Sequence, residues 1–335
     1  MILSLKNNPS HLAPYWSTIS MEKHITPEQQ HTGKISVIIV TWNAYSWIAN
    51  CLKSLKSDLS AFSHSIIIVD NASSDQTVSY IKTQFPEIIL IENKTNNGFA
   101  QACNTALQKS CSEYVLFLNP DTEVIPGMTK SLLAFMEKHQ EAGAIGPTLL
   151  NPDGTLQLSG NTFPNLKNIL SESFFLDRLF PNSRFFGLHK MSHIDRSKVL
   201  KVDWTMGSCL FVRREALDRA GNFDSNYFLF FEETDLCLRL RNAGYEIYLL
   251  PGARLIHFGG ASSPELYNAE KIIHYHKSLF YYFRKHMPHQ LIFLKMILFS
   301  RSLLRIILWL TLYPANAKTA AEKLSGYGKV LKLCF

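Results

Sequence analysis

Four short apolar runs, rich in β-branched residues, lie in the first third of the chain. They span residues 35–40, 65–69, 88–91 and 114–118. Apolar runs of this length are typical of strands that are buried on both faces of a sheet. The segments between them carry apolar residues at helical spacing, as at Ile48, Cys51, Leu52 and Leu55. This alternation of strand and helix predicts an α/β fold with right-handed βαβ units and a mainly parallel central sheet flanked by helices.

Polar residues follow each of these runs directly. They are Thr41 and Asn43 after the first run, Asp70 and Asn71 after the second, Asn97 and Gly98 after the third, and Asn119 and Asp121 after the fourth. In a parallel sheet, ligands bind beyond the carboxyl ends of the strands. Asparagine and aspartate also suit turns and helix N-caps for purely local reasons. The recurrence of polar residues at all four strand ends therefore indicates a functional site more strongly than any one of them does.

The second half of the chain has a different pattern. Residues 151–154 read Asn-Pro-Asp-Gly, a hairpin signal, and a strand is expected around residues 206–208. A helix should begin near Glu232. Residues 246–250 and 254–258 are predicted to form two short strands, and a helix should follow from about residue 264 to residue 286.

The segment Asn119-Pro120-Asp121 offers oxygen ligands directly after an apolar strand. A carboxylate together with substrate phosphates is a common way to hold Mg²⁺ or Mn²⁺. A turn built by proline and asparagine is the alternative interpretation. No glycine-rich loop of the dinucleotide or P-loop type follows the first run, so a phosphate site must be built in another way.

Glu232 and Glu233 lie at the predicted start of a helix, after the aromatic segment 227–231. Acidic residues at that position favour the helix dipole, which is a sufficient structural reason for them. A carboxylate that aromatic neighbours partly desolvate is equally suited to act as a general base. His257 is ambiguous in the same way: it could be structural, although the Gly-Gly pair that follows would let the backbone approach a ligand.

The composition is that of a folded, globular protein, since 46% of the 335 residues are hydrophobic and 18% are charged. The six cysteines form no C-x-x-C pair. Neither a zinc cage nor a disulfide framework is therefore predicted, and a reducing compartment is the simplest interpretation. The net charge of +7 favours phosphate-bearing or anionic-membrane partners. No nucleic-acid-binding signature accompanies this charge, so we expect no nucleic-acid partner.

Both ends of the chain differ from its centre. Residues 1–34 are polar, without an apolar run of signal-peptide length, which predicts a loosely ordered N-terminal extension. Residues 287–313 are largely apolar but carry three cations on one arc of a helical projection, Lys295, Arg301 and Arg305. A membrane-spanning helix needs about 20 nearly uncharged residues, so an amphipathic helix lying in the membrane interface is the better prediction.

In that interfacial interpretation, the three cations face anionic headgroups, while Leu291, Leu294, Leu298, Ile306 and Trp309 enter the acyl layer. The alternative is that the helix packs on the catalytic domain or on a second copy of the chain in a homodimer.

Seven motifs, taken in order, resemble those of the inverting family 2 glycosyltransferases of GT-A fold, particularly the rhamnosyltransferase-like branch. The resemblance spans roughly residues 35 to 285. The motifs are Thr41-Trp42-Asn43, Val69-Asp70-Asn71 with Asp75, Asn96-Asn97-Gly98-Phe99-Ala100, Leu118-Asn119-Pro120-Asp121, Gly207-Ser208, Glu232-Glu233 with Asp235, and His257 with the Gly-Gly pair.

The resemblance implies a GT-A catalytic domain over residues 35–265 and a helical C-terminal region over 266–335. It also implies that a nucleotide-diphospho-sugar binds at the positions that match the family's motifs. These positions are Thr41, Asn43, Asp70, Asn71, Asn97, Gly98, Asn119 and Gly207.

The family's D-x-D motif, often written Asn-Pro-Asp in this branch, corresponds to residues 119–121. A divalent cation, Mg²⁺ or Mn²⁺, is therefore expected on Asp121, with His257 as a second ligand. The family's Glu-Asp pair is Glu232-Glu233 here, which implies that Glu233 is the catalytic base and Glu232 its neighbour in the site. Should no cation be needed, Lys277 is the residue expected to neutralise the leaving diphosphate.

The implied reaction is inverting glycosyl transfer, with dTDP-rhamnose as the first candidate donor. A lipid-linked or polysaccharide acceptor, used in cell-surface polysaccharide synthesis at the cytoplasmic face of the membrane, is the matching expectation. Two other classes stay open: a catalytically silent sugar-nucleotide-binding or assembly subunit, and a nucleotidyltransferase. The latter would be expected to carry a basic glycine-rich loop after the first strand, where this chain has Thr41-Trp42-Asn43-Ala44.

Overall fold

The computed structural model describes residues 33–187, 189–191, 194–259, 269–313 and 317–335. The predicted N-terminal extension over residues 1–34 therefore lies almost wholly outside the described residues, as does the second glycine after His257.

The N-terminal half forms the predicted parallel βαβ units. Its elements are β1 (Ile35–Thr41), α1 (Tyr45–Leu59), β2 (His64–Asp70), α2 (Thr77–Gln84), β3 (Ile89–Glu92), α3 (Phe99–Leu107) and β4 (Tyr114–Leu118). The strands pair in parallel in the order β3-β2-β1-β4. The carboxyl ends of all four strands consequently lie at one edge of the sheet, together with the polar residues that follow them.

The second half continues the same sheet but is mixed in direction. It contains β5 (Thr122–Val124), α4 (Met128–Lys138), β6 (Ala142–Leu150), β7 (Leu156–Gln157), α5 (Leu166–Ser173), α6 (Leu176–Leu179), β8 (Leu200–Val202), β9 (Cys209–Arg213), α7 (Arg214–Ala220), α8 (Glu232–Asn242) and β10 (Glu246–His257). The sheet order runs on as β4-β9-β6-β10-β5, and β9 is antiparallel to both of its neighbours. In this half β6 and β10 also pair in parallel, whereas β5, β7 and β8 pair antiparallel with their neighbours, so the sheet as a whole is mixed.

Two sequence-based element predictions were wrong. Residues 206–208 form no strand; they lie in the turn that leads into β9, which begins at Cys209. The two short strands expected over 246–258 are one strand, β10, whose pairing with β6 shifts register between Leu250 and Arg254. The hairpin signal at 151–154 was correct, since Gly154, with φ of +81°, lies between the antiparallel strands β6 and β7.

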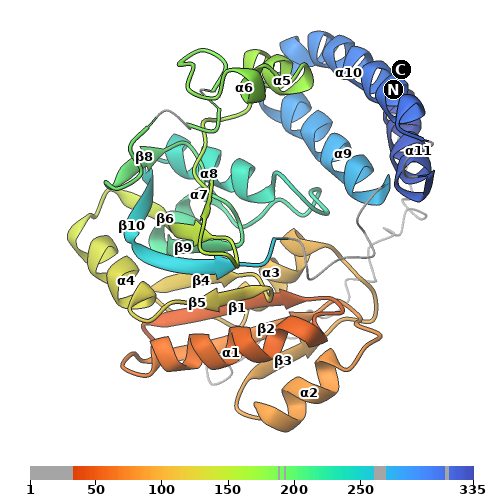
Figure 1. Cartoon of the computed structure of the whole chain (residues 1–335). Coiled ribbons are helices and arrows are strands. Elements are labelled where there is room, and N and C mark those ends of the chain that lie inside the picture. Colours follow the sequence, from red (N-terminus) through yellow and green to blue (C-terminus); the bar gives the residue numbers. More distant parts are fainter. Residues whose placement is uncertain (1–32, 188, 192–193, 260–268, 314–316) are drawn as a thin grey trace, which may run out of the picture.

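The sheet has an apolar core on each face, because alternate residues of a strand point to opposite sides. On one face Val37 and Ile39 of β1 pack with α1 and α4, and on the other face Ile38 of β1 packs with α3 and α8. The alternation places the helices of the βαβ units on both sides of the sheet (Figure 1).

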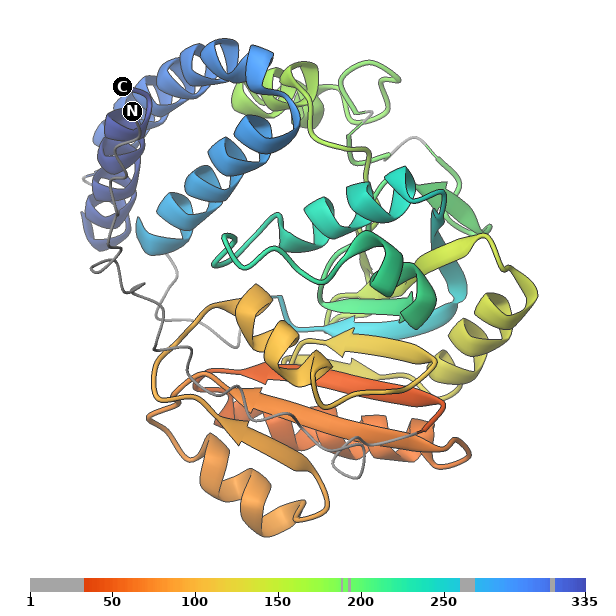
Figure 2. The ribbon, with the colours of Figure 1, turned by 180° about the vertical axis from the view of Figure 1, so that it is seen from behind.

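Three C-terminal helices form a separate layer with α5 and α6. They are α9 (Ala269–His286), α10 (Leu291–Thr311), which follows a short 3₁₀ turn at Pro288–Gln290, and α11 (Ala317–Leu333). Both views show α8 between the sheet and α9, with α10 and α11 beyond α9 (Figure 2). A third apolar cluster joins this layer to the rest of the molecule through Ile169 of α5 and the aromatic segment before α8.

The predicted orientation of α10 was wrong for two of its leucines and two of its arginines. Leu294 and Leu298, expected in the acyl layer, are buried against the protein, and Arg301 and Arg305 turn inward, toward Tyr275 of α9 and Phe175 beside α6. The exposed face is apolar instead, and consists of Ile292, Phe293, Met296, Leu303, Leu304, Ile307, Leu308 and Leu310. Within the described part of the chain, no helix is long and apolar enough to cross a membrane.

Candidate active site

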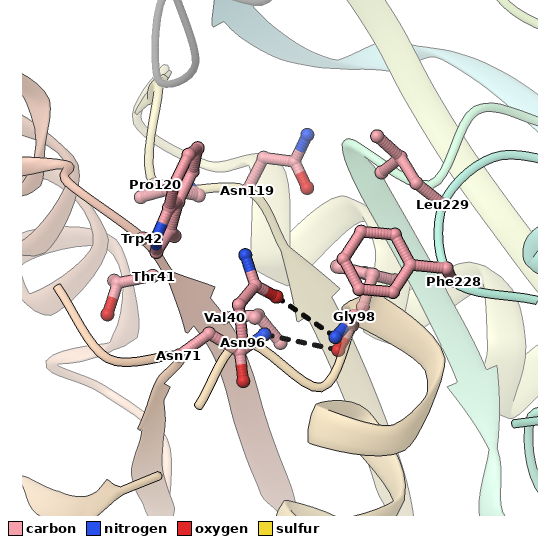
Figure 3. Close-up of a pocket in the computed structure, with 11 residues that line it drawn as sticks. Val40, Thr41, Trp42, Asn71, Asn96, Gly98, Asn119, Pro120, Phe228 and Leu229 are labelled. Carbon is pink, nitrogen blue, oxygen red and sulfur yellow. Dashed lines mark hydrogen bonds between the residues drawn. The ribbon is translucent and has the colours of Figure 1, made fainter. Parts of the chain in front are cut away.

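A pocket of about 130 Å³ opens at the polar edge of the parallel strands (Figure 3). One wall comes from the ends of β1, β2 and β4 and from the loop before α3, and the opposite wall is formed by Phe228 and Leu229 of the segment before α8. Of the residues predicted to bind a nucleotide-sugar, the pocket brings together Thr41, Asn71, Gly98 and Asn119.

Asp70 and Asn43, also predicted to bind the donor, are engaged in shaping the strand-end loops. The Asp70 carboxylate is 2% exposed; it accepts a hydrogen bond from the Thr41 hydroxyl at 2.9 Å and another from the Ser73 backbone N–H at 2.8 Å. The side-chain oxygen of Asn43 accepts a hydrogen bond from the Ser74 backbone N–H at 2.8 Å. In this structure both residues hold the loops that position the pocket wall, and neither lines the pocket.

Asn97 was predicted to bind the donor, but the neighbouring Asn96 faces the pocket in its place. Asn97 is exposed, and its side-chain oxygen accepts a hydrogen bond from the Thr95 hydroxyl. Asn96 lines the pocket instead, and its oxygen accepts a hydrogen bond from the Gly98 N–H at 3.0 Å. On the other side Asn71 donates to the Gly98 carbonyl at 3.1 Å, so two asparagines clamp this glycine (Figure 3).

Gly98 is required for two reasons. Its φ of +81° lies in the region that favours glycine, and a Cβ added to it would come within 2.5 Å of the Phe228 carbonyl oxygen. The close approach lets the N–H of Phe99 donate to that same carbonyl at 2.9 Å. This contact joins the two walls of the pocket.

The two predicted metal ligands meet at the adjoining end of the site. Asp121 and His257 line a second cavity, of about 330 Å³, in which Nε2 of His257 lies 3.7 Å from Oδ1 of Asp121. The Nδ1 atom of His257 lies 2.7 Å from Oε1 of Gln157, which can only accept, so the ring proton is on Nδ1. Nε2 therefore carries a lone pair, is buried, and makes no hydrogen bond to any described residue.

That geometry fits a divalent cation held by two protein ligands. A separation of 3.7 Å is too long for a hydrogen bond but suits two ligands of one ion. Among the described residues no group of three or more His, Cys, Asp or Glu side chains could hold a metal. Substrate phosphate oxygens and water are common further ligands of such a cation.

Lys271, which the sequence analysis did not single out, lines the same cavity. Burial lowers the pKa of its ammonium group, and the nearby Asp121 opposes that effect. Lys277, the cation expected to assist the leaving diphosphate, is exposed on α9. The first turn of α9 therefore supplies the positive charge of the site.

Glu232 and Glu233 enter the site through a strained turn. Phe230 and Phe231, directly before α8, have φ values of +69° and +70°, an unfavourable conformation for aromatic residues. Such strain is often found where a fold must aim a functional side chain. The turn directs both carboxylates into the cavity that contains Asp121 and His257.

Both carboxyls are shielded from water. Burial raises the pKa of each, and repulsion by Glu233 raises the pKa of Glu232 further. The backbone N–H groups of Gly207 and Thr234 donate to Glu233 and partly oppose the rise of its pKa. One oxygen of each carboxylate, Oε2, is buried without a hydrogen-bond partner among the described residues.

Glu233 differs from Glu232 in facing a further cavity. This cavity, of about 270 Å³, is largely apolar and aromatic, with Trp204, Phe231 and Tyr275 in its walls. Glu233 lines both this cavity and the one that contains Asp121, whereas Glu232 lines only the latter. Glu233 thus lies at the junction of these two cavities.

Asp235, the third acid of the motif, ties α8 to α9 through ion pairs, a role that was not predicted; we call this group of ion pairs the Asp235 anchor. Its fully buried carboxylate lies 2.8 Å from Nε of Arg239, and 2.7 Å from both Nζ of Lys285 and Nε2 of His286 at the end of α9. Burial alone would raise its pKa, but these partners lower the pKa to about 2. The anchor fixes α8, and with it Glu233, against α9.

Comparison with known proteins gives a consistent result. The family model described as "Glycosyl transferase family 2" matches residues 36–221, more than half of the chain. N-acetylglucosaminyl-diphospho-decaprenol L-rhamnosyltransferase of Mycobacterium tuberculosis is 28% identical over 237 residues, which are 68% of this chain and 76% of that protein. Rhamnosyltransferase WbbL of Escherichia coli K12 is 26% identical, over 67% of this chain and 83% of its own length.

Among solved structures, the mannosyltransferase PcManGT of Pyrobaculum calidifontis, in complex with GDP-Man and Mn²⁺, is similar to this chain with a TM-score of 0.52. The sequence identity is 15%, over 92% of this chain and 89% of that one. At this identity the likeness concerns the fold alone.

Proposed function

Because this chain belongs to glycosyl transferase family 2 and is a glycosyltransferase of GT-A fold, as its motifs predicted, we propose that it is an inverting rhamnosyltransferase. The proposed donor is dTDP-rhamnose and the proposed acceptor a lipid-linked or polysaccharide-bound sugar. The names of the relatives in M. tuberculosis and E. coli support this choice of sugar. The observation that carries the proposal is the position of Glu233 at the junction of two cavities.

The donor occupies the pocket at the strand ends. Thr41, Asn71 and Asn96 face the nucleoside, while the diphosphate points toward Asp121 and His257. Held by these two residues, Mg²⁺ or Mn²⁺ would neutralise the negative charge that develops on the departing diphosphate. Lys271, in the same cavity, adds a positive charge of the protein's own.

The acceptor enters from the aromatic cavity, and its hydroxyl approaches Glu233. The carboxylate takes the proton of that hydroxyl while the oxygen forms a bond to the anomeric carbon. The bond from that carbon to the diphosphate oxygen breaks in the same step, with its electrons leaving on the diphosphate. Attack opposite to the leaving group inverts the configuration, and the transition state is oxocarbenium-like. The raised pKa of Glu233 brings the carboxylate nearer to the pKa that suits a general base at neutral pH.

The substitution Glu233→Gln tests this assignment, because it keeps the shape of the side chain and removes its ability to accept a proton. We expect the rate of transfer to fall about 10²- to 10⁴-fold with donor affinity little changed. Glu232→Gln is the matched control and should be milder, because Glu232 does not face the acceptor cavity. The assay measures nucleoside diphosphate release from a panel of nucleotide sugars.

Two results would contradict the proposal. If Glu232→Gln lowers the rate of transfer more than Glu233→Gln does, Glu232 is the catalytic base. Release of no nucleoside diphosphate from any donor by the unaltered protein would favour the catalytically silent binding subunit.

The acceptor class and the exposed face of α10 together suggest attachment to the cytoplasmic face of a membrane. The net charge of +7 favours an anionic surface, and the exposed apolar residues of α10 are suited to enter the acyl boundary. The same apolar face could instead be covered by a second copy of the chain, which is the competing homodimer.

A further inference from the structure

A group of arginines lies where α10 meets α5 and α6, outside the site described above. The guanidinium of Arg305 stacks on Phe175 at 3.9 Å from the ring centroid, and Arg178 lies 5.6 Å from the same ring. Arg301, one turn before Arg305 on α10, lies 6.0 Å from the ring of Tyr275. We call Arg178, Arg301 and Arg305 the arginine cluster.

The arginine cluster has hydrogen-bond donors that the described chain leaves unused. Nε and Nη1 of Arg301 and Nε of Arg305 are buried and make no hydrogen bond to a described residue. No carboxylate of the described chain pairs with either guanidinium; the nearby Asp177 accepts instead from Lys190, at 2.7 Å. Burial and the neighbouring Arg301 and Arg178 lower the pKa of Arg305, while Tyr327 and Asp177 oppose that effect.

Buried donors without acceptors cost free energy, so their presence points to a ligand that satisfies them. Guanidinium groups suit phosphate oxygens, because their planar donors bind two oxygens at once. A phosphate group would also neutralise the mutual repulsion within the cluster.

The cluster lies beside the aromatic cavity, and Arg301 and Arg305 lie on the same helix that carries the exposed apolar residues. Tyr275, beside Arg301, and Lys190, paired with Asp177, both line that cavity, which Glu233 also lines. On its outer side, α10 carries the exposed apolar residues. An acceptor whose reacting sugar lies in the cavity would therefore place its anionic linkage at the cluster and an apolar chain on α10.

We propose that Arg301 and Arg305, assisted by Arg178, bind the diphosphate that links the acceptor sugar to a lipid. The inference rests on the proposed function and makes it narrower: the acceptor is a lipid diphosphate sugar, recognised through its diphosphate. The donor's diphosphate is bound elsewhere, beside Asp121.

The test measures binding of farnesyl diphosphate to the full chain, followed by tryptophan fluorescence. Replacing both arginines, Arg301→Gln with Arg305→Gln, should weaken this binding at least about 100-fold, because the charge-assisted hydrogen bonds of both guanidinium groups to the diphosphate are lost. Arg301→Lys with Arg305→Lys should lose less, because the charge stays but bidentate contact is lost. Asp121→Asn is the matched control at the donor site and should bind the probe as the unaltered chain does. Farnesol, which has no phosphate, should bind weakly to every variant.

Either of two outcomes would overturn the proposal. If Asp121→Asn loses the probe and the arginine variants keep it, the probe occupies the donor site. If the arginine variants keep farnesyl diphosphate but no longer bind vesicles that contain phosphatidylglycerol, the arginines bind bulk lipid headgroups.

The thermal unfolding of each variant is measured alongside, and the lysine pair serves as the test if the glutamine pair does not fold. Failure of the proposed function is distinguishable from failure of this site. If the chain binds farnesyl diphosphate through the arginines but releases nucleoside diphosphate from no donor, the proposed diphosphate site stands and the proposed glycosyltransferase function fails.

Discussion

At the scale of the residue, two neighbouring glutamates differ in their surroundings. Glu232 is 6% exposed and faces only the cavity with Asp121, whereas Glu233 also faces the aromatic cavity. A buried carboxyl with a raised pKa binds a proton more readily in the folded than in the unfolded chain. The stability of the fold therefore falls as the pH rises from the ordinary glutamate pKa of 4.5 toward the raised value.

Glu232→Gln should consequently stabilise the protein at pH 8. The glutamine cannot ionise, so the penalty for a buried charge disappears and the free energy of unfolding should rise. The gain should vanish near pH 4, where both forms are neutral. Urea unfolding at the two pH values measures it, and a variant less stable than the parent at pH 8 would contradict the raised pKa.

Asp121 carries the second prediction at this scale. Asp121→Ala should abolish transfer, and EDTA should do the same to the unaltered enzyme, because in the proposed mechanism Asp121, His257 and the donor phosphates would together hold the cation. Restoring activity with Mg²⁺ or Mn²⁺ after EDTA is the control. Full activity in EDTA would instead assign charge neutralisation to Lys271.

At the scale of the element, α8 is held by the Asp235 anchor to the end of α9. The pKa of about 2 lies below the ordinary value of 3.8, so the anchor stabilises the fold above pH 3.8 and this contribution is lost as the pH falls through 2. Arg239, Lys285 and His286 would all lose this carboxylate as a partner if it were removed, and Lys285 would keep only its pair with Asp224 among the ion pairs of the described residues.

Asp235→Asn should cost about 3–5 kcal/mol in the free energy of unfolding at pH 7, as breaking a buried ion pair does. The difference from the parent should shrink as the pH approaches 2. The matched control is Asp218→Asn, which removes an aspartate from a pair with Arg214 four residues away on α7; with 60% of the Asp218 side chain exposed, its loss should cost at most about 1 kcal/mol. Chemical denaturation of both variants measures the contrast, and equal losses would show that the anchor contributes no more than a surface pair.

The sequence predicts some elements far better than others, for physical reasons. The apolar runs of β1 to β4 are unambiguous, because strands buried on both faces need continuous apolar residues. The strand expected at 206–208 was placed too early, because Gly207 and Ser208 form the turn and the continuous apolar run begins only at Cys209. The direction of β9 depends on pairing with strands far along the chain, which local pattern does not encode.

Similar limits apply to the site. The strand-end motifs indicated the correct edge of the sheet, but adjacent asparagines at 96 and 97 are equivalent in sequence, and only the clamp around Gly98 decides which one faces inward. The structural role of Asp235 could not be predicted, because its partners Lys285 and His286 lie some 50 residues further along the sequence. On α10, amphipathicity defined two faces without saying which one the protein covers. The roles of the individual site residues remain predictions.

At the scale of the whole molecule, the helical layer presents an apolar surface beside a catalytic domain. Replacing Ile292, Met296 and Ile307 together by glutamine should release the protein from anionic vesicles. Each side chain that leaves the acyl boundary loses roughly 1.5–3 kcal/mol of hydrophobic free energy. All three are about 60% exposed, so the fold should be little affected.

Vesicle flotation measures this release, and Tyr45→Gln with Val199→Gln is the control, because these exposed apolar residues lie away from α10. If the triple variant still floats, or if the parent proves to be a dimer that the triple variant dissociates, the surface packs on protein.

The insertion of β9 between β4 and β6 has a consequence for synthesis on the ribosome. The apolar edge of β4 pairs with β9, which begins about 90 residues later in the chain. At a synthesis rate of about 5–20 residues per second, the ribosome needs roughly 5–18 s to make those residues. During this interval β4 is an unpaired apolar edge, a known hazard for association with other chains. We therefore expect the nascent chain to depend on chaperones until Cys209–Arg213 emerges, and slow codons placed between β4 and β9 to lower the yield of folded protein.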